Sequence, residues 1–161
     1  MKTKKLVIMA LFIALSFIGA NIKIAGSIAF DSTAGFLGTL IMGPLYGAVI
    51  GAVGHLLTAA VSGFPLSLPI HMIVMVDMAL TMFLFGIVYK IFSKSKEITA
   101  VIVSGIVGVL INGPLSVFML IPIMGKAVLA MLPLLVLAAV LNIVIAHVIY
   151  KFLPGSIKEW K

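Results

Sequence analysis

Long apolar runs separated by short polar breaks make up almost the whole chain. A helix that crosses the hydrocarbon core of a bilayer needs about 20 mostly apolar residues. Six segments meet or approach this length, at residues 6–22, 28–43, 44–61, 70–89, 98–118 and 127–150. The pattern therefore predicts an all-α integral membrane protein, with one membrane domain over residues 1–161 folded as a bundle of six transmembrane helices.

The boundary between the second and third spans lies in the uncharged stretch from Ser32 to Val76. The dipeptide Gly43-Pro44 is a turn signal and divides this stretch into two helices. The first of them is short, so we expect it to begin at about residue 28 or to lie tilted inside the bundle. A loop with two prolines at residues 62–69 then separates the third span from the fourth.

The positions of the lysines indicate how the chain is oriented across the membrane. Cytoplasmic loops of membrane proteins carry an excess of basic residues. With six spans and both termini in the cytoplasm, nine of the eleven lysines face the cytoplasm, namely Lys2, Lys4, Lys5, Lys90, Lys94, Lys96, Lys151, Lys158 and Lys161. With five spans the last two clusters would move outside, so the charge distribution favours six.

The first apolar run has a second interpretation. Lys2, Lys4 and Lys5 followed by apolar residues from Leu6 to Ala20 also resemble a signal peptide. Because five further spans follow, we interpret this run as the first membrane helix.

Composition narrows the class of protein. The chain is 63% hydrophobic and only 9% charged, whereas a soluble domain is about 25% charged. The net charge of +7 comes from lysines at the edges of apolar runs and involves no arginine, so it does not indicate nucleic-acid binding. The absence of cysteine excludes disulfides and thiolate metal sites.

Three polar residues lie within predicted spans at a similar depth. Asp77, His55 and Asn112 are each about 9–10 Å from the outer end of their helix. Ionisable groups in the membrane are costly and often functional. The segments above this layer add further candidates for a small-ligand pocket: Asn21, Lys23, Phe30, Asp31, Phe64 and His71.

Other interpretations of these residues stay open. Asp77, His55 and Asn112 alone would also serve to hold helices together by hydrogen bonds, as in a structural or assembly protein. A self-sufficient small transporter would need polar groups along a whole path, and the inner half is apolar. The histidines lack metal-ligand spacing, and the chain carries no protease or nucleotide-binding motif. We therefore expect no metal, no cofactor and no enzymatic activity.

Two sequence stretches carry a family resemblance. They read GSIAFDSTAGFLG at residues 26–38 and GPLYGAVIGAVGH at residues 43–55. Together with the size, the six spans and an A-x-x-x-A pair at Ala10 and Ala14, they resemble the substrate-binding S component of energy-coupling factor (ECF) vitamin transporters.

The resemblance implies a mode of action. Such a protein captures a vitamin or vitamin precursor from outside the cell membrane of a prokaryote and releases it inside by toppling in the bilayer. A transmembrane coupling protein and two ATP-binding-cassette ATPases drive the cycle, and the face with Ala10 and Ala14 docks on the coupling protein.

Within the family, residues 30–71 look most like the group assigned to α-ribazole, a benzimidazole nucleoside used in cobalamin salvage. Asp31 or Asp77 would accept hydrogen bonds from ribose hydroxyls, and Phe30 or Phe64 would stack on the ring. A pyrimidine-type or pyridoxine-type precursor is the alternative. Members for nickel and cobalt need a histidine at the second position, where this chain has Lys2.

Overall fold

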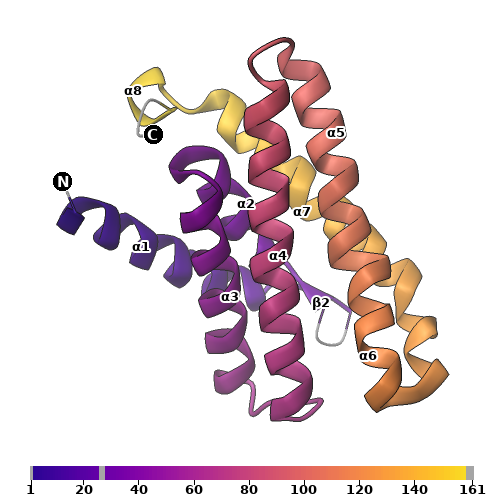
Figure 1. Ribbon diagram of the computed structural model, residues 1–161. Helices are drawn as coiled ribbons and strands as arrows, with labels where there is room; N and C mark the ends of the chain where they lie inside the picture. Colours follow the sequence, from indigo (N-terminus) through magenta and orange to yellow (C-terminus); the bar gives the residue numbers. More distant parts are fainter. Residues whose placement is uncertain (1, 26–27, 159–161) are drawn as a thin grey trace.

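The computed structural model describes residues 2–25 and 28–158 and is helical apart from one short strand pair. The first two residues of the resemblance motif, Gly26 and Ser27, lie outside the described residues. The helices are α1 (Lys2–Ala20), α2 (Asp31–Met42), α3 (Pro44–Val61), α4 (Leu68–Phe92), α5 (Glu97–Leu110), η1 (Ile111–Leu115), α6 (Ser116–Met124), η2 (Gly125–Met131), α7 (Leu132–Phe152) and α8 (Gly155–Lys158) (Figure 1). The strands β1 (Lys23–Ala25) and β2 (Ile28–Ala29) pair antiparallel.

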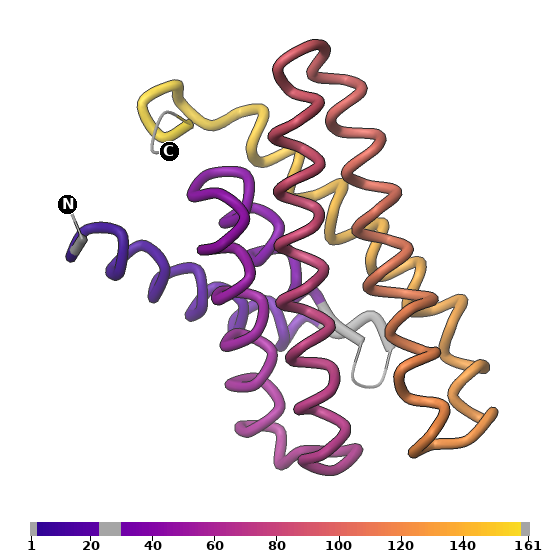
Figure 2. Tube along the Cα trace, in the orientation of Figure 1, coloured from indigo at the N-terminus to yellow at the C-terminus, as the bar shows by residue number. Residues whose placement is uncertain are grey.

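Four stretches of the described chain are long and apolar enough to cross a membrane: Thr3–Ala20, Pro44–Val61, Leu68–Phe92 and Glu97–Phe152. The last one has 56 residues, and Figure 2 shows that it turns back on itself, with α7 returning alongside α5 and α6. The helical fold is thereby confirmed, with four candidate membrane-spanning stretches in the described residues. The count of six spans and the cytoplasmic position of both termini stay predictions.

The second predicted span, residues 28–43, differs most from its helix. Residues 28 and 29 form β2, and α2 begins only at Asp31. Its 12 residues reach about 18 Å, short of a hydrocarbon core of about 30 Å. Most of its side chains are buried, because α1, α3, α4 and α7 all pack against it. Thus α2 is an internal helix that other helices shield from lipid.

Glycines allow the central helices to approach closely. A Cβ atom at Gly51 in α3 would lie 2.8 Å from Met82 Cγ in α4, and one at Gly47 would clash with Thr39 in α2. Gly43 differs, since its φ of +94° makes the turn between α2 and α3 and nothing lies near it. Small residues at such contacts are typical of helix packing in membranes.

The fifth predicted span, residues 98–118, is longer and less regular than expected. Pro114 lies in the π-helical turn η1 between α5 and α6, because proline lacks the N–H that an α-helix would use at that point. The helix then continues through Pro122 to Met124. The reversal comes at Gly125, with a φ of +67°, between the predicted fifth and sixth spans.

Two clusters of buried apolar side chains fill the bundle. The larger one joins α2, α3, α4 and α7, and in it the rings of Phe36 and Phe85 meet edge to face with centroids 4.9 Å apart. The smaller one joins the start of α4 to α6 and η2 through Ile70, Val117 and Leu120. Burial of these side chains fixes the relative positions of the helices that surround the site.

Candidate functional site

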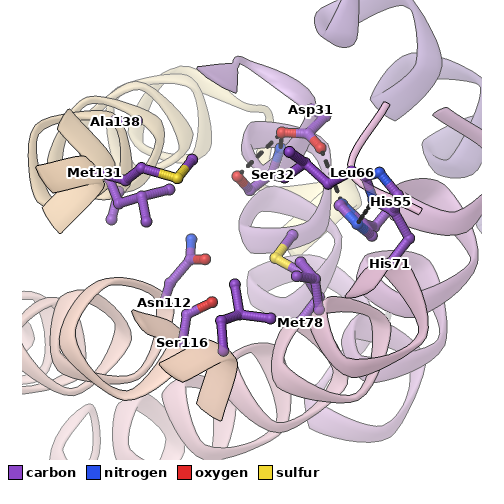
Figure 3. A pocket seen from close by; sticks show the side chains of 14 residues that line it. Asp31, Ser32, His55, Leu66, His71, Met78, Asn112, Ser116, Met131 and Ala138 are labelled. Carbon is purple, nitrogen blue, oxygen red and sulfur yellow. Dashed lines mark hydrogen bonds and ion pairs between the residues drawn. The ribbon is translucent and has the colours of Figure 1, made fainter. Parts of the chain in front are cut away.

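A cavity of about 120 Å³ lies between the two apolar clusters, enclosed by α2, α3, α4, η1, α6 and α7. Figure 3 shows its lining. Most of the lining is apolar, and the side chains with polar groups are Asp31, Ser32, His55, His71, Asn112 and Ser116. An apolar cavity with a few convergent polar groups is the usual form of a small-ligand site.

Asp31, His55 and His71 form a chain of polar contacts along one wall (Figure 3). The Asp31 Oδ2 atom lies 3.7 Å from His55 Nδ1, and His55 Nε2 lies 3.2 Å from His71 Nδ1. The three residues come from α2, α3 and α4. The sequence-predicted residues Asp31, His55 and His71 are thus neighbours in the fold.

The local structure around Asp31 holds its carboxylate in place. Asp31 is the first residue of α2, where a negative charge is favoured by the helix dipole. The backbone N–H of Ser32 donates to Asp31 Oδ1 at 2.9 Å, and Ser16 Oγ of α1 donates to the Asp31 carbonyl at 2.6 Å. Asp31 Oδ2 therefore stays directed at His55.

The order of contacts favours one arrangement of donors and acceptors on the two imidazole rings. A carboxylate can only accept, so His55 presents Nδ1–H to Asp31, and its Nε2 accepts from His71 Nδ1–H. His71 Nε2 then carries a lone pair. This atom is buried and has no hydrogen-bond partner among the described residues. The cluster is thus arranged to accept a hydrogen bond from a ligand that carries an N–H or O–H group.

The loop between α3 and α4 closes one side of the cavity. Phe64 and Ser67 have positive φ angles of 51° and 96°, a conformation that side chains other than glycine rarely adopt. The ring of Phe64 lies 5.8 Å from the ring of His71, and Leu66 lines the cavity. Strained backbone of this kind clusters at ligand sites.

The opposite wall comes from the irregular part of the α5–α6 helix (Figure 3). Asn112 lies in η1, and Ser116 follows at the start of α6. π-helical turns are frequent at functional sites. Asn112 was a sequence-predicted site residue and Ser116 was not. The signal that points to Ser116 is Pro114, because a proline inside a predicted span marks irregular backbone there.

Asp77 lies outside the cavity lining. Its side chain is fully buried, and neither carboxyl oxygen has a hydrogen-bond partner among the described residues. Ser116 lines the cavity. Its hydroxyl lies near the Asp77 carboxyl group, but the geometry does not meet that of a hydrogen bond. Asp77 thus lies behind the cavity wall, near Ser116 and within electrostatic range of His55.

The remaining predicted residues lie elsewhere. Asn21 is exposed, and its Nδ2 donates to the Phe17 carbonyl. Phe30 lines a separate apolar groove between α1, α2 and α7. Ala10 and Ala14 are exposed on α1, whose N-terminal half projects away from the other helices (Figure 1).

Among residues 2–25 and 28–158, no group of three or more histidine and acidic side chains is placed to hold a metal ion.

Comparison with known proteins gives one match. A family model described as ECF transporter, substrate-specific component, matches residues 4–154. No curated protein sequence matches the chain, and no solved structure does. Since the match covers nearly the whole chain, the protein belongs to the substrate-specific (S) components of ECF transporters, which are membrane subunits that bind substrate and associate with the ECF coupling protein and ATPases.

Proposed function

We propose that the cavity lined by Asp31, His55 and His71 is the site where this S component captures a vitamin or vitamin precursor from outside the cell. The observation that carries the proposal is the unpartnered Nε2 atom of His71, buried in the wall of an otherwise apolar cavity. A buried polar atom without a partner costs free energy, and a bound ligand with a donor group removes that cost.

The position of the cavity agrees with uptake from outside. Its lining includes Leu66 of the α3–α4 loop and Met131 at the end of η2. Three lysines, Lys90, Lys94 and Lys96, lie at the other end of α4. By the bias of basic residues toward the cytoplasm, six spans with both termini inside put the cavity in the outer half of the membrane. Release inside would then follow from reorientation of the whole bundle.

α-Ribazole is the ligand that we propose first. Its ribose hydroxyls would donate to His71 Nε2 and to the Asp31 carboxylate. Its benzimidazole would lie among Met78, Leu120 and Leu135, with Phe64 beside His71 at the loop. Asn112 would supply both a donor and an acceptor from the opposite wall.

A second class of ligand is favoured by the size of the cavity. A volume of about 120 Å³ is below the roughly 300–1,000 Å³ of sites for drug-sized ligands. A single-ring compound such as a pyrimidine-type or pyridoxine-type precursor needs less room than a nucleoside. α-Ribazole would need the α3–α4 loop to move outward.

Docking on the coupling protein is the second part of the proposal. Ala10 and Ala14 lie one helical turn apart and are exposed. Small residues at this spacing let a partner helix approach closely in lipid. We place the contact with the coupling protein on this face of α1.

The experiment that tests the site compares the wild type with a His71→Ala variant. Small molecules that co-purify with each detergent-solubilised protein are identified by mass spectrometry. Melting curves are then recorded with added α-ribazole, a pyrimidine precursor and a pyridoxine precursor. We expect one compound to co-purify with the wild type and to raise its melting temperature. With the variant, we expect less of this compound to co-purify and the melting temperature to rise less at the same ligand concentration.

A folding control accompanies that comparison. The variant without ligand should melt close to the ligand-free wild type, because Ala removes a group that makes one hydrogen bond. If His71→Ala retains as much compound as the wild type, the cavity is not the substrate site.

A further inference from the structure

An apolar groove runs along the outside of the bundle between α5 and α7. It has a volume of about 550 Å³, and its walls are aliphatic apart from His147. Ile102, Ile106 and Val144 line it, and each is about half exposed. The groove is wide at Gly105, where a Cβ atom would meet only Ile143, at 3.7 Å.

A second cavity of about 660 Å³ continues the groove at the lysine-rich end of the bundle. The two share Val101, His147 and Val148 in their linings. The second cavity has more polar groups than the groove, and its lining includes Tyr89, Glu97, Tyr150, Lys151 and Lys158. The apolar groove therefore ends in an aromatic rim with two lysines and one glutamate, which is net cationic.

The groups at the rim are held in place by contacts within the chain. Lys158 Nζ donates to the Lys151 carbonyl at 2.9 Å and lies 5.4 Å from the centre of the Tyr150 ring. The rings of Tyr89 and Tyr150 meet at right angles with centroids 6.3 Å apart. The two lysines and the two tyrosines thus form one cluster where α4 and α7 end.

His147 lies where the groove and the rim meet. Its Nδ1 donates to the Ile143 carbonyl at 3.0 Å, because a carbonyl oxygen can only accept. Its Nε2 is buried and has no hydrogen-bond partner among the described residues. An unpartnered polar atom at the end of an apolar groove fits a ligand whose polar part begins next to His147.

We propose that this composite groove binds one phospholipid, with an acyl chain between α5 and α7 and its phosphate between Lys151 and Lys158. An aliphatic groove that leads to a cationic rim complements an amphiphile with an anionic group. A partner helix fits less well, since such contacts favour small residues and this groove is bordered by branched aliphatic side chains. The proposal is independent of the substrate cavity, from which these residues are absent.

Native mass spectrometry of the full chain in detergent tests the proposal. The delipidated protein is titrated with dioleoylphosphatidylglycerol and, separately, with dioleoylglycerol, which has the same chains and no phosphate. A lysine near anionic lipid contributes roughly a factor of five in affinity. We expect Lys151→Ala and Lys158→Ala each to weaken phosphatidylglycerol binding about fivefold.

Lys94→Ala is the matched control, because Lys94 is exposed at the same end and lines neither cavity. It should leave lipid binding unchanged. Gly105→Leu should fill the groove and weaken binding of both lipids while the melting temperature stays close to the wild-type value. Equal affinity for the two lipids in the wild type, or wild-type binding in a Lys151→Ala and Lys158→Ala double variant, would overturn the proposal.

Discussion

His55 Nε2 and His71 Nδ1 lie 3.2 Å apart and link α3 to α4 at the wall of the cavity. The two ring centroids are 5.3 Å apart. The α3–α4 loop, with positive φ angles at Gly63, Phe64 and Ser67, separates them in sequence. Because His55 is oriented in turn by Asp31, the proton positions on all three groups depend on one another.

The first prediction concerns this pair. His71→Ala removes the acceptor proposed for the ligand, and a typical hydrogen bond contributes about 0.5–1.5 kcal/mol. We expect ligand affinity to fall roughly two- to tenfold. His55→Ala should lower it as well, because His71 loses the group that fixes its proton. Calorimetric titration with the co-purifying compound measures both effects.

The double variant provides the control for that experiment. If the two histidines act as one unit, His55→Ala adds little once His71 is absent. Fully additive losses would mean that each histidine contacts the ligand independently.

The second prediction concerns topology and uses the absence of cysteine from the chain. Ser67 and Ser95 are both exposed and lie before and after α4. A Ser67→Cys variant should react with a membrane-impermeant maleimide in intact cells. The matched Ser95→Cys variant should react only after the membrane is opened. The reverse result would contradict the proposed orientation.

The long apolar helices were predictable from the sequence. The short length and the buried position of α2 were not. Hydropathy places apolar residues away from water, and it does not distinguish lipid from the protein interior. The run at 70–89 therefore matched α4 within a few residues. The run at 28–43 looked like another span, although α2 is short and surrounded by protein.

The sequence predicted how deep the candidate site residues lie along their helices. It did not predict which way their side chains point around the helix axis. His71, Val74 and Met78 line the cavity, as expected for one face of α4. Asp77 has a similar depth to His55, but it is turned by about 120° from His71 at 3.6 residues per turn. Only the helix packing shows which face meets the cavity.

The third prediction concerns the docking face on α1. Changing Ala10 or Ala14 to Trp should block close approach of a partner helix. Because both positions are exposed, ligand binding by the isolated protein should remain while transport by the complete complex falls. Uptake of labelled ligand into cells, compared with titration of the purified variant, separates the two.

Leu15→Trp is the control for α1, because Leu15 is 49% exposed and points about 140° away from Ala10 and about 100° away from Ala14. It should leave transport unchanged. Loss of ligand binding in the Ala10→Trp variant would mean that this face packs inside the protein.

The fourth prediction concerns the close contact of α3 with α4. A Cβ atom in Gly51→Ala would lie 2.8 Å from Met82 Cγ and 3.1 Å from the Met78 carbonyl oxygen. Overpacking of this kind costs about 1–3 kcal/mol, so the melting temperature in detergent should fall. Gly105→Ala, with ordinary contact at 3.7 Å, should melt like the wild type. Equal melting of the two variants would contradict the close packing.

The last prediction separates the two aspartates. Asp31→Asn keeps an acceptor for the Ser32 N–H but removes the charge that orients His55. A hydrogen bond to a charged group contributes about 1.5–3 kcal/mol, so ligand affinity should fall roughly ten- to a hundredfold.

Asp77→Asn should behave in the opposite way. Asp77 is fully buried, and its carboxyl oxygens make no hydrogen bond among the described residues. A neutral amide of nearly the same shape leaves no charge buried at this position, and burial of an unpaired charge is costly. We therefore expect unchanged ligand affinity and an equal or higher melting temperature.

Calorimetric titration and a melting curve on each variant measure both quantities. A lower melting temperature with full affinity would show that Asp77 holds helices together, and a loss of affinity at equal stability would make it part of the floor of the site.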